Sequence, residues 1–426
     1  MTSIIASDKP VKNTLSSGKL LTLLILASVA APLSLNKAAP ILPLLMTDLH
    51  IGETGAGMLI SIFSLVGVVL AIPGGHLIRR IGPRRAGLLA LASLAAGSAS
   101  GALADGFFLL LSTRILEGFG MALMAITGPV LIATRIPKKR RGFAMGLFAA
   151  NMGIGQVLAF NAAPALAAVT GRSGVWWACA GYSLVFLLFW FFLMPGDDAQ
   201  IDEVPANEVS ETNRLGNKAA DIEKSDDTAV DQLHEKQKVP GIARNRSIRH
   251  LTLSICLYVL FYGSIQTFLP TYLSHERGMN LTAAAGVASI CCFMGIVMSL
   301  VTGILCDKTG KRRLFGGVGL VVGAGLILLI PVTPVGWFIL LAAVFGMFPP
   351  MLPVAAYAAA PEVLADPSEN SMALSLFSLG QNAGLVIGPI LFGALVQLAG
   401  WTTTFHLMIP LALLSAAFIL TDRRIR

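Results

Sequence analysis

Residues 75–85 read GHLIRRIGPRR and residues 303–313 read GILCDKTGKRR, so one pattern of glycines and arginines occurs twice in the chain. The two copies are offset by 228 residues, which relates Gly82 to Gly310, for example. The same offset, or one within two residues of it, relates four further pairs: Gly67 and Gly295, Gly118 and Gly346, Gly155 and Gly384, and Pro40 and Pro270. The chain therefore consists of two related halves.

Clusters of positive charge include these two segments and alternate with apolar stretches. The clusters are Arg79, Arg80, Arg84 and Arg85; then Arg135, Lys138, Lys139, Arg140 and Arg141; then Lys308, Lys311, Arg312 and Arg313. The apolar stretches hold about 20 residues, the length that a helix needs to cross ~30 Å of hydrocarbon. Because basic loops face the cytoplasm, the alternation predicts a multi-pass membrane protein with these loops on the cytoplasmic side.

Composition agrees with a membrane protein and argues against a nucleic-acid partner. Hydrophobic residues make up 55% of the 426 positions and charged residues 13%, whereas soluble proteins carry about 25% charged residues. The net charge is +8, but all except four of the 31 Lys and Arg residues fall in predicted cytoplasmic segments. The exceptions are Arg172 and Arg277 in outer loops, and Lys37 and Arg114 inside predicted spans. The positive charge therefore reflects topology.

Hydropathy predicts an all-α membrane protein with twelve transmembrane helices in two pseudo-symmetric six-helix halves. The predicted spans are 20–46, 54–75, 85–104, 107–134, 142–168, 175–195, 249–273, 281–305, 314–332, 334–360, 371–397 and 401–421. An even number places both termini in the cytoplasm. The predicted organisation is a cytoplasmic tail (1–19), an N-terminal half (20–195), a flexible charged linker (196–248), a C-terminal half (249–421) and a short tail (422–426).

Three charged residues fall inside the spans, where charge costs at least ~2.5–3.5 kcal/mol near the bilayer centre. Lys37 is interpreted as an anchor for an anionic substrate, or else as a lysine whose side chain reaches the outer interface. Arg114 and Glu117 are three residues apart, so they share a helix face and are expected to pair. From the residues alone, the interpretation is a structural pair that fixes its helix.

Further candidates are uncharged. Tyr258, Tyr262 and Gln266 recur every four residues and form one stripe of hydrogen-bonding groups, which serves either a substrate or interhelical hydrogen bonds. Tyr357 is a weaker candidate for the same site. Three prolines within residues 349–353 predict a bend, because proline interrupts a regular helix.

The repeated loop resembles a marker of the major facilitator superfamily, G-x-L-x-D-[RK]-x-G-[RK]-[RK]-[RK]. Residues 303–313 match it with Asp307 in place, whereas Arg79 stands at the aspartate position of the first copy. A second marker, R-x-x-x-G-x-G, reads Arg114 to Gly120. A weaker resemblance, in residues 114–123 and 136–148, is to the cyanate/nitroimidazole permeases and organic-anion symporters. The glycine- and proline-rich signature of drug:proton antiporters is missing from the fifth span.

The resemblance implies a monomeric secondary transporter of the inner membrane that works by alternating access and needs no cofactor. It also implies that spans one, four, seven and ten line the cavity, and that the loop motif acts in gating. The arginine of the second marker, Arg114 here, is implied to take part in proton coupling or substrate binding, which is the alternative to a structural pair with Glu117. The motif residues are Gly75, Arg79, Gly82 and Arg84 in the first half, and Gly303, Asp307, Gly310 and Arg312 in the second. Asp307 is expected to pair with arginines or a helix N-terminus when the cytoplasmic side closes.

The expected function is proton-coupled uptake of a small organic or inorganic anion. Two cations against one carboxylate in the spans favour an anionic solute. If substrate engages Arg114, Glu117 loses a partner and becomes easier to protonate, which would couple the two movements. The alternatives are an exporter of drugs or metabolites and a membrane sensor whose output segment is the linker. No ATP-binding loop or enzyme motif is found in the sequence.

Overall fold

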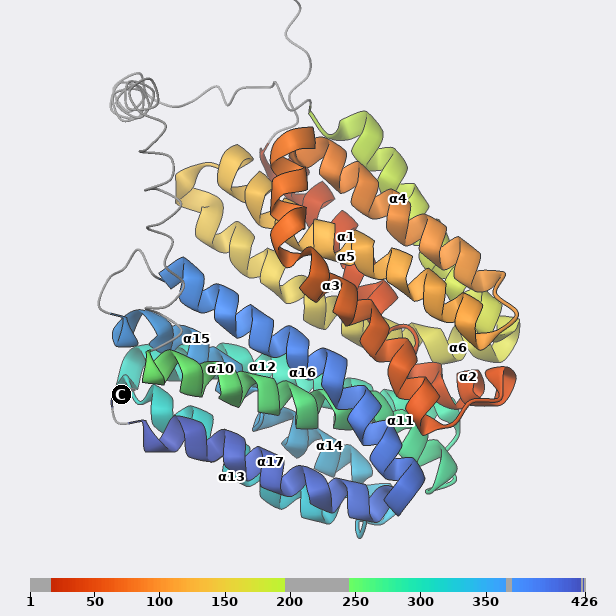
Figure 1. Ribbon diagram of the computed structural model, residues 1–426, viewed down its shortest axis with the longest axis vertical. Coiled ribbons are helices and arrows are strands. Elements are labelled where there is room, and N and C mark those ends of the chain that lie inside the picture. Colours follow the sequence, from red (N-terminus) through yellow and green to blue (C-terminus); the bar gives the residue numbers. More distant parts are fainter. Residues whose placement is uncertain (1–16, 196–244, 365–369, 423, 425–426) are drawn as a thin grey trace, which may run out of the picture.

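The computed structural model describes residues 17–195, 245–364, 370–422 and 424. All regular elements in these ranges are helices, arranged in two bundles that meet along their lengths (Figure 1). The predicted all-α membrane fold is therefore confirmed. The predicted tail up to residue 16 and the linker up to residue 244 lie outside the described residues, and α10 begins at Arg246.

The first bundle holds the red-to-yellow-green helices of Figure 1. Its helices are α1 (Ser17–Asn36), η1 (Ala39–Ile41), α2 (Leu42–Leu49), α3 (Glu53–Ile81), α4 (Pro83–Ala102), α5 (Phe107–Arg135) and α6 (Lys138–Leu193). Prolines lie in the first turn of η1, α2 and α4, where a residue needs no backbone donor. Helix α4 packs against α5 and α6, and α1 packs against α6.

The second bundle holds the green-to-blue helices. Its helices are α10 (Arg246–Tyr258), η2 (Val259–Gly263), α11 (Ser264–His275), α12 (Leu281–Thr309), α13 (Arg312–Leu329), η3 (Val335–Trp337), α14 (Phe338–Met347), α15 (Met351–Val363), α16 (Asn370–Ala399) and α17 (Trp401–Thr421). Residues 348–350 separate α14 from α15, so the predicted bend lies at the proline cluster.

Ten helical segments are long and apolar enough to cross a membrane in the part of the chain that the structure describes. One of them covers most of α6, although Gly171 has non-helical dihedrals (φ 67°, ψ −170°) that divide this helix into two arms. Helix α4 has 20 residues but is not among the ten. The count of twelve spans therefore stays a prediction.

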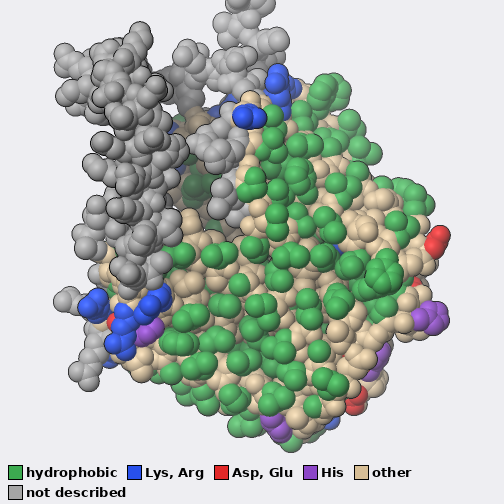
Figure 2. All heavy atoms as spheres, viewed as in Figure 1, with side chains coloured by type: hydrophobic (Ala, Val, Ile, Leu, Met, Phe, Trp, Pro, Cys, Tyr) green, Lys and Arg blue, Asp and Glu red, His purple; other side chains and the backbone are tan. Residues whose placement is uncertain are grey.

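The basic loops define one end of the molecule, called the basic end below. These loops lie where α3 meets α4, where α5 meets α6 and where α12 meets α13. In the space-filling view, lysines and arginines gather toward the left and top, whereas carboxylates and histidines appear mainly at the opposite end (Figure 2). This separation matches the charge pattern from which the cytoplasmic side was predicted.

The two bundles pack along two seams, α3 with α16 and α6 with α12. Away from the basic end, Thr54 Oγ1 donates to Gln397 Oε1 at 2.7 Å across the first seam. A side chain at Gly57 would collide with the carbonyl of Pro389, and one at Gly393 would collide with the carbonyl of Glu53. Glycine therefore permits backbone contact here, and the seam is closed at this end.

Candidate functional site

The charged residues of the first bundle form one buried cluster around Glu117. Lys37 Nζ lies 2.5 Å from Glu117 Oε1, and Arg114 Nη1 lies 2.6 Å from Glu117 Oε2. Ser98 Oγ donates to Glu117 Oε1 at 2.7 Å and accepts from Lys37 Nζ at 2.9 Å. Each carboxylate oxygen thus has its own cation. The predicted Arg114–Glu117 pair is present, and Lys37 joins it.

Arg114 also donates to backbone carbonyls at the end of α1 and in α3. Its guanidinium donates to the carbonyls of Ser34 (2.7 Å) and Leu35 (3.0 Å), and its Nε donates to Leu59 of α3 (3.3 Å). The last carbonyls of a helix have no partner inside the helix and carry partial negative charge, so a cation is favourable there. Arg114 therefore joins α1, α3 and α5, and this is a structural role as well as an electrostatic one.

Glycines in α4 bring this helix close enough for Ser98 to reach the cluster. An ideal Cβ at Gly97 would lie 2.7 Å from the Cγ of Glu117, and one at Gly101 would collide with the indole of Trp176. The four-residue spacing of Gly97 and Gly101 is the small-residue pattern that allows close helix packing in membranes. This spacing is the sequence signal from which the α4 contribution could have been found.

Aromatic rings cover both cations. The Arg114 guanidinium carbon lies 4.5 Å from the centroid of the Phe63 ring, and Lys37 Nζ lies 4.7 Å from that of Trp176. Such contacts stabilise cations that have lost their water. Lys37, Arg114 and Glu117 are each 0% exposed. The cluster carries a formal charge of +1 and is sealed from solvent in this conformation.

The predicted stripe of α10 to α11 forms a second, separate cluster in the other bundle. The rings of Tyr258 and Tyr262 stack with centroids 5.2 Å apart, and Gln266 Nε2 donates to Tyr262 Oη at 2.9 Å. Two cysteines of α12 complete it: Cys291 Sγ accepts from Gln266 Nε2 at 3.1 Å, and Cys292 Sγ donates to Gln266 Oε1 at 3.6 Å. Among the described residues, no hydrogen bond or ion pair joins this cluster to Glu117.

A π-helical turn sets the geometry of this stripe. Residues Val259–Gly263 form η2, between α10 and α11. One-turn π segments are rare and occur often at functional sites. Tyr357, the weaker candidate, donates from its hydroxyl to Gln381 Oε1 at 3.4 Å in the same bundle.

The predicted gating residues lie at the basic end. Gly82 (φ 82°) and Gly310 (φ 67°) end α3 and α12 with positive φ, which glycine adopts without strain. Arg84 Nη2 donates to the Phe191 carbonyl at 2.7 Å and so ties α4 to the end of α6. The Asp307 side chain is exposed, and no ion pair with another described residue is recorded for it.

The remaining gating candidates are Gly303 and Arg312 in the second half and Gly75 and Arg79 in the first half. Gly303 lies in α12, where a Cβ added to it would be 4.0 Å from Val354 Cγ1. Arg312 is the first residue of α13. Gly75 and Arg79 lie within α3, and their side-chain environment is outside the described part of the chain. The gating roles remain predictions.

One cavity of the structure has a volume of about 900 Å³. It lies between α3, α5 and α16, in the portion of these helices nearer the basic end. None of the predicted binding residues lines it, so Lys37, Arg114 and the tyrosine stripe do not face this cavity in the present conformation. Phe63 lines it and also covers Arg114. Sequence reasoning missed Phe63, Ser98 and Trp176.

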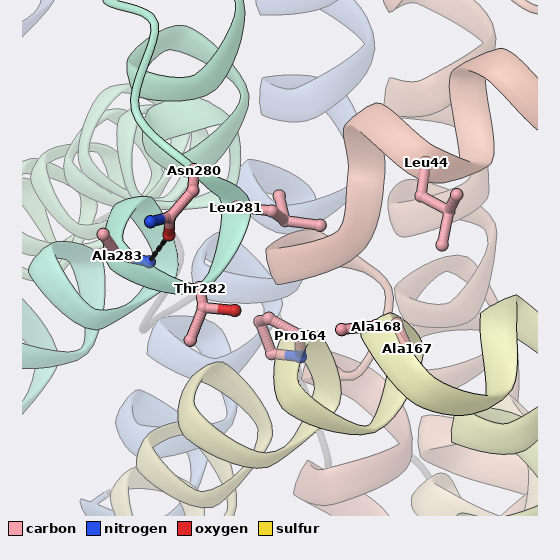
Figure 3. A pocket seen from close by; sticks show the side chains of 8 residues that line it. All are labelled: Leu44, Pro164, Ala167, Ala168, Asn280, Leu281, Thr282 and Ala283. Carbon is pink, nitrogen blue, oxygen red and sulfur yellow. Dashed lines mark hydrogen bonds between the residues drawn. The ribbon is translucent and has the colours of Figure 1, made fainter.

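A shallower groove of about 660 Å³ lies at the other end of the molecule, between α2, α6 and the start of α12 (Figure 3). Its polar side chains are few. Asn280 Oδ1 accepts from the backbone N–H of Ala283 at 2.7 Å and so caps α12, as the dashed line in Figure 3 shows. This amide already has a structural role, and no charged residue lines the groove.

The family model of the Major Facilitator Superfamily matches residues 24–364 and 305–425. Among curated proteins, the chain is similar to the probable galactarate/D-glucarate transporter GudP of Escherichia coli (strain K12), with 24% identity over 83% of this chain and 81% of the relative. It is also similar to the probable sulfoacetate transporter SauU of Cupriavidus necator, with 24% identity over 68% of this chain and 66% of the relative. The hexuronate transporter of Bacillus subtilis is 22% identical over 69% and 65% of the two chains.

Solved structures agree on the fold. A bacterial homologue of the human lysosomal transporter Spinster, in an inward-facing and unoccupied conformation, superposes with a TM-score of 0.78 at 14% identity. The superposition covers 95% of this chain and 96% of that one. This likeness shows the fold, and the family match shows that the chain is a multi-pass membrane transporter and not an enzyme.

Proposed function

Because this chain belongs to the Major Facilitator Superfamily, we propose that it moves a small anionic solute across the membrane by alternating access, with protons as the coupling ion. The family match over most of the chain and the transporter relatives show that the protein is a membrane transporter. The proposed direction is uptake into the cytoplasm. The relatives named for glucarate, hexuronate and sulfoacetate transport support an anionic substrate.

The observation that carries the proposal is the Lys37–Glu117–Arg114 cluster. Two cations share one carboxylate inside the bilayer, so the cluster has an excess positive charge that an anion would neutralise. A carboxylate and an added anion compete for the same cations. Binding of the solute near Arg114 or Lys37 would therefore favour protonation of Glu117, and release of the solute would favour loss of that proton.

The position of the cavity supports alternating access. The seam between α3 and α16 is closed away from the basic end, whereas the cavity lies nearer the basic end. The exposed Asp307 agrees with a basic end whose latch is disengaged. The arrangement fits the cytoplasm-open state of such a cycle, if the basic loops are cytoplasmic as predicted.

The alternative hypothesis is export of drugs or metabolites, and the lining of the cavity argues against it. An exporter of cationic drugs would be expected to have an acidic, aromatic cavity. Of the residues recorded as lining the 900 Å³ cavity, none is acidic and Phe63 alone is aromatic.

The test is transport in proteoliposomes with labelled D-glucarate, glucuronate and sulfoacetate, at pH 5.5 outside and 7.5 inside. Two pH units sustain about 100-fold accumulation per coupled proton. We expect Glu117→Gln to abolish pH-driven accumulation while solute exchange at equal pH continues. The control Glu276→Gln changes an exposed carboxylate outside the cluster and should leave both activities intact. Unchanged accumulation in Glu117→Gln would refute the coupling role.

A further inference from the structure

The 900 Å³ cavity has a composition that does not suit a small hydrophilic ion. Its apolar lining comes from three helices and includes Phe63 of α3, Met121 and Ile126 of α5, and Leu379 and Leu385 of α16. Polar side chains in the lining are Ser64, Ser375, Ser378 and Asn382, and no charged residue is recorded there. Asn382 uses its Nδ2 to donate to the Ser378 carbonyl at 2.9 Å. A solute rich in hydroxyl groups would lose water here and regain few hydrogen bonds.

The size of the cavity points the same way. Ligand pockets for drug-sized molecules span roughly 300–1,000 Å³, and this cavity is near the upper end of that range. An ion of three or four atoms would leave most of it to water against an apolar wall. A body of the size of a substituted benzene ring or a medium-length alkyl chain would instead bury apolar surface, which is favourable.

Phe63 connects the cavity to the positive charge. Phe63 is among the residues that line the cavity, it is buried, and the centroid of its ring lies 4.5 Å from the guanidinium carbon of Arg114. Gly118, one residue after Glu117, also lines the cavity, and a side chain there would press on the Phe63 carbonyl. Phe63 is therefore the residue that the cavity wall and the contacts of the Arg114 guanidinium have in common.

We propose that the cavity between α3, α5 and α16 binds the apolar body of an amphipathic monoanion, whose charged group reaches Arg114 when the Phe63 ring moves aside. This inference rests on the proposed anion transport and narrows it to aryl- or alkyl-carboxylates and their sulfonate equivalents. Phe63 then acts as a positioning residue: it holds the cation away from the cavity until a ligand with enough apolar surface fills the space beside it.

The experiment measures dissociation constants in lipid nanodiscs, by isothermal titration, for three probes. 3-Phenylpropionate has both features, 3-phenylpropionamide has the apolar body without the charge, and D-glucarate has charge without an apolar body. We expect 3-phenylpropionate to bind at least about tenfold more tightly than either comparison, corresponding to about 1.4 kcal/mol.

Matched tryptophan substitutions locate the binding. Ala125→Trp adds an indole ring to the lining of the cavity, whereas Ala178→Trp adds the same ring at an exposed position of α6 that does not line the cavity. Ala125→Trp should weaken 3-phenylpropionate binding at least about tenfold, and Ala178→Trp should not. If Ala125→Trp does not fold, Leu379→Phe changes the opposite wall, on α16. Phe63→Leu should narrow the difference between 3-phenylpropionate and D-glucarate.

The outcomes separate this inference from the proposed function. Tight glucarate binding that Ala125→Trp leaves unchanged would overturn the amphipathic-anion inference and leave anion transport standing. Equal binding of the acid and the amide would overturn the inference, and if D-glucarate also failed to bind, the proposed anion transport would be overturned with it, because no charge would then be recognised. Retention of 3-phenylpropionate binding in both cavity variants would place the ligand elsewhere and overturn the inference.

Discussion

At the scale of single residues, Glu117 is the centre of the charge balance in the first bundle. It holds Lys37 at 2.5 Å and Arg114 at 2.6 Å with no access to solvent. Removing one member of a buried ion pair costs about 3–5 kcal/mol, because the remaining charge is left without compensation. Here the cost depends on which member is removed, since one anion faces two cations.

Glu117→Gln should therefore destabilise the protein more than Lys37→Met. The first change leaves two buried cations without an anion, whereas the second leaves the neutral Arg114–Glu117 pair intact. We expect the lower melting temperature for Glu117→Gln, measured by tryptophan fluorescence in detergent. If Glu117→Gln lowered the melting temperature no more than Lys37→Met does, this account of the charge balance would be wrong.

Gly97 tests how tightly α4 approaches the same carboxylate. An alanine Cβ would lie 2.7 Å from Glu117 Cγ and 3.0 Å from the Glu117 backbone nitrogen, so Gly97→Ala should cost about 1–3 kcal/mol through overpacking. Gly181→Ala is the matched control, because nothing lies within 4 Å of its Cβ position. Alanine is the better helix former, so the control should keep or raise the melting temperature. A raised value for Gly97→Ala would show that α4 yields easily.

At the scale of elements, the π-turn η2 joins α10 to α11 and presents two stacked tyrosines. They differ in their hydroxyl groups. Tyr262 Oη accepts from Gln266 at 2.9 Å and lies 3.8 Å from Cys291 Sγ, whereas no hydrogen bond to another described residue is recorded for the Tyr258 hydroxyl.

Tyr262→Phe should for this reason cost about 1 kcal/mol or more, and Tyr258→Phe should cost less. Loss of the Tyr262 hydroxyl leaves the Gln266 amide with fewer partners in a buried site. The measurement is the melting temperature of each variant in the absence of ligand, and Tyr262→Phe should have the lower value. If Tyr258→Phe were the more damaging change, the hydroxyl of Tyr258 would have a role that this conformation does not display.

At the scale of the whole molecule, the glycines of the α3–α16 seam hold the end opposite the basic loops closed. Gly57→Leu should separate the two helices there, because its side chain would meet the carbonyl of Pro389. We expect the population to shift toward a conformation open at this end. Leu103 and Thr403 are exposed and lie near this end on opposite bundles. With the five native cysteines replaced, spin labels at these two positions should be farther apart in Gly57→Leu when measured by double electron–electron resonance. Gly106→Leu, which has nothing within 4 Å, should leave the distance unchanged.

Much of the whole-molecule architecture was predictable, because it follows from composition and repetition. Hydropathy and the repeated loop predicted helices, membrane insertion and family, and the three-residue spacing predicted the Arg114–Glu117 pair. The number of spans did not follow as directly, since α6 is one long apolar segment that Gly171 divides into two arms and α4 is not among the ten apolar segments.

The closure of the charge cluster was not predictable from local spacing. Lys37 and Glu117 are 80 residues apart, and their contact depends on the break after α1 and on the glycines of α4. The tyrosine stripe was predicted as a stripe, but its cysteine partners come from α12, where nothing in the sequence of Cys291 and Cys292 distinguishes a partner of Gln266 from a packing residue. Such contacts are set by how helices cross, which hydropathy does not encode.

The confinement of Lys37, Arg114 and Glu117 to one bundle has an electrical consequence. When the bundles rock, this unit of +1 moves together, and a full crossing of 100 mV would involve about 2.3 kcal/mol per charge. A bound monoanion cancels that charge, but the proton that the proposed coupling adds to Glu117 restores it, so the loaded and the empty carrier would both move with a charge of +1. The membrane voltage would then speed one of these two movements and slow the other. The complete cycle, which carries one anion with one proton, would move no net charge.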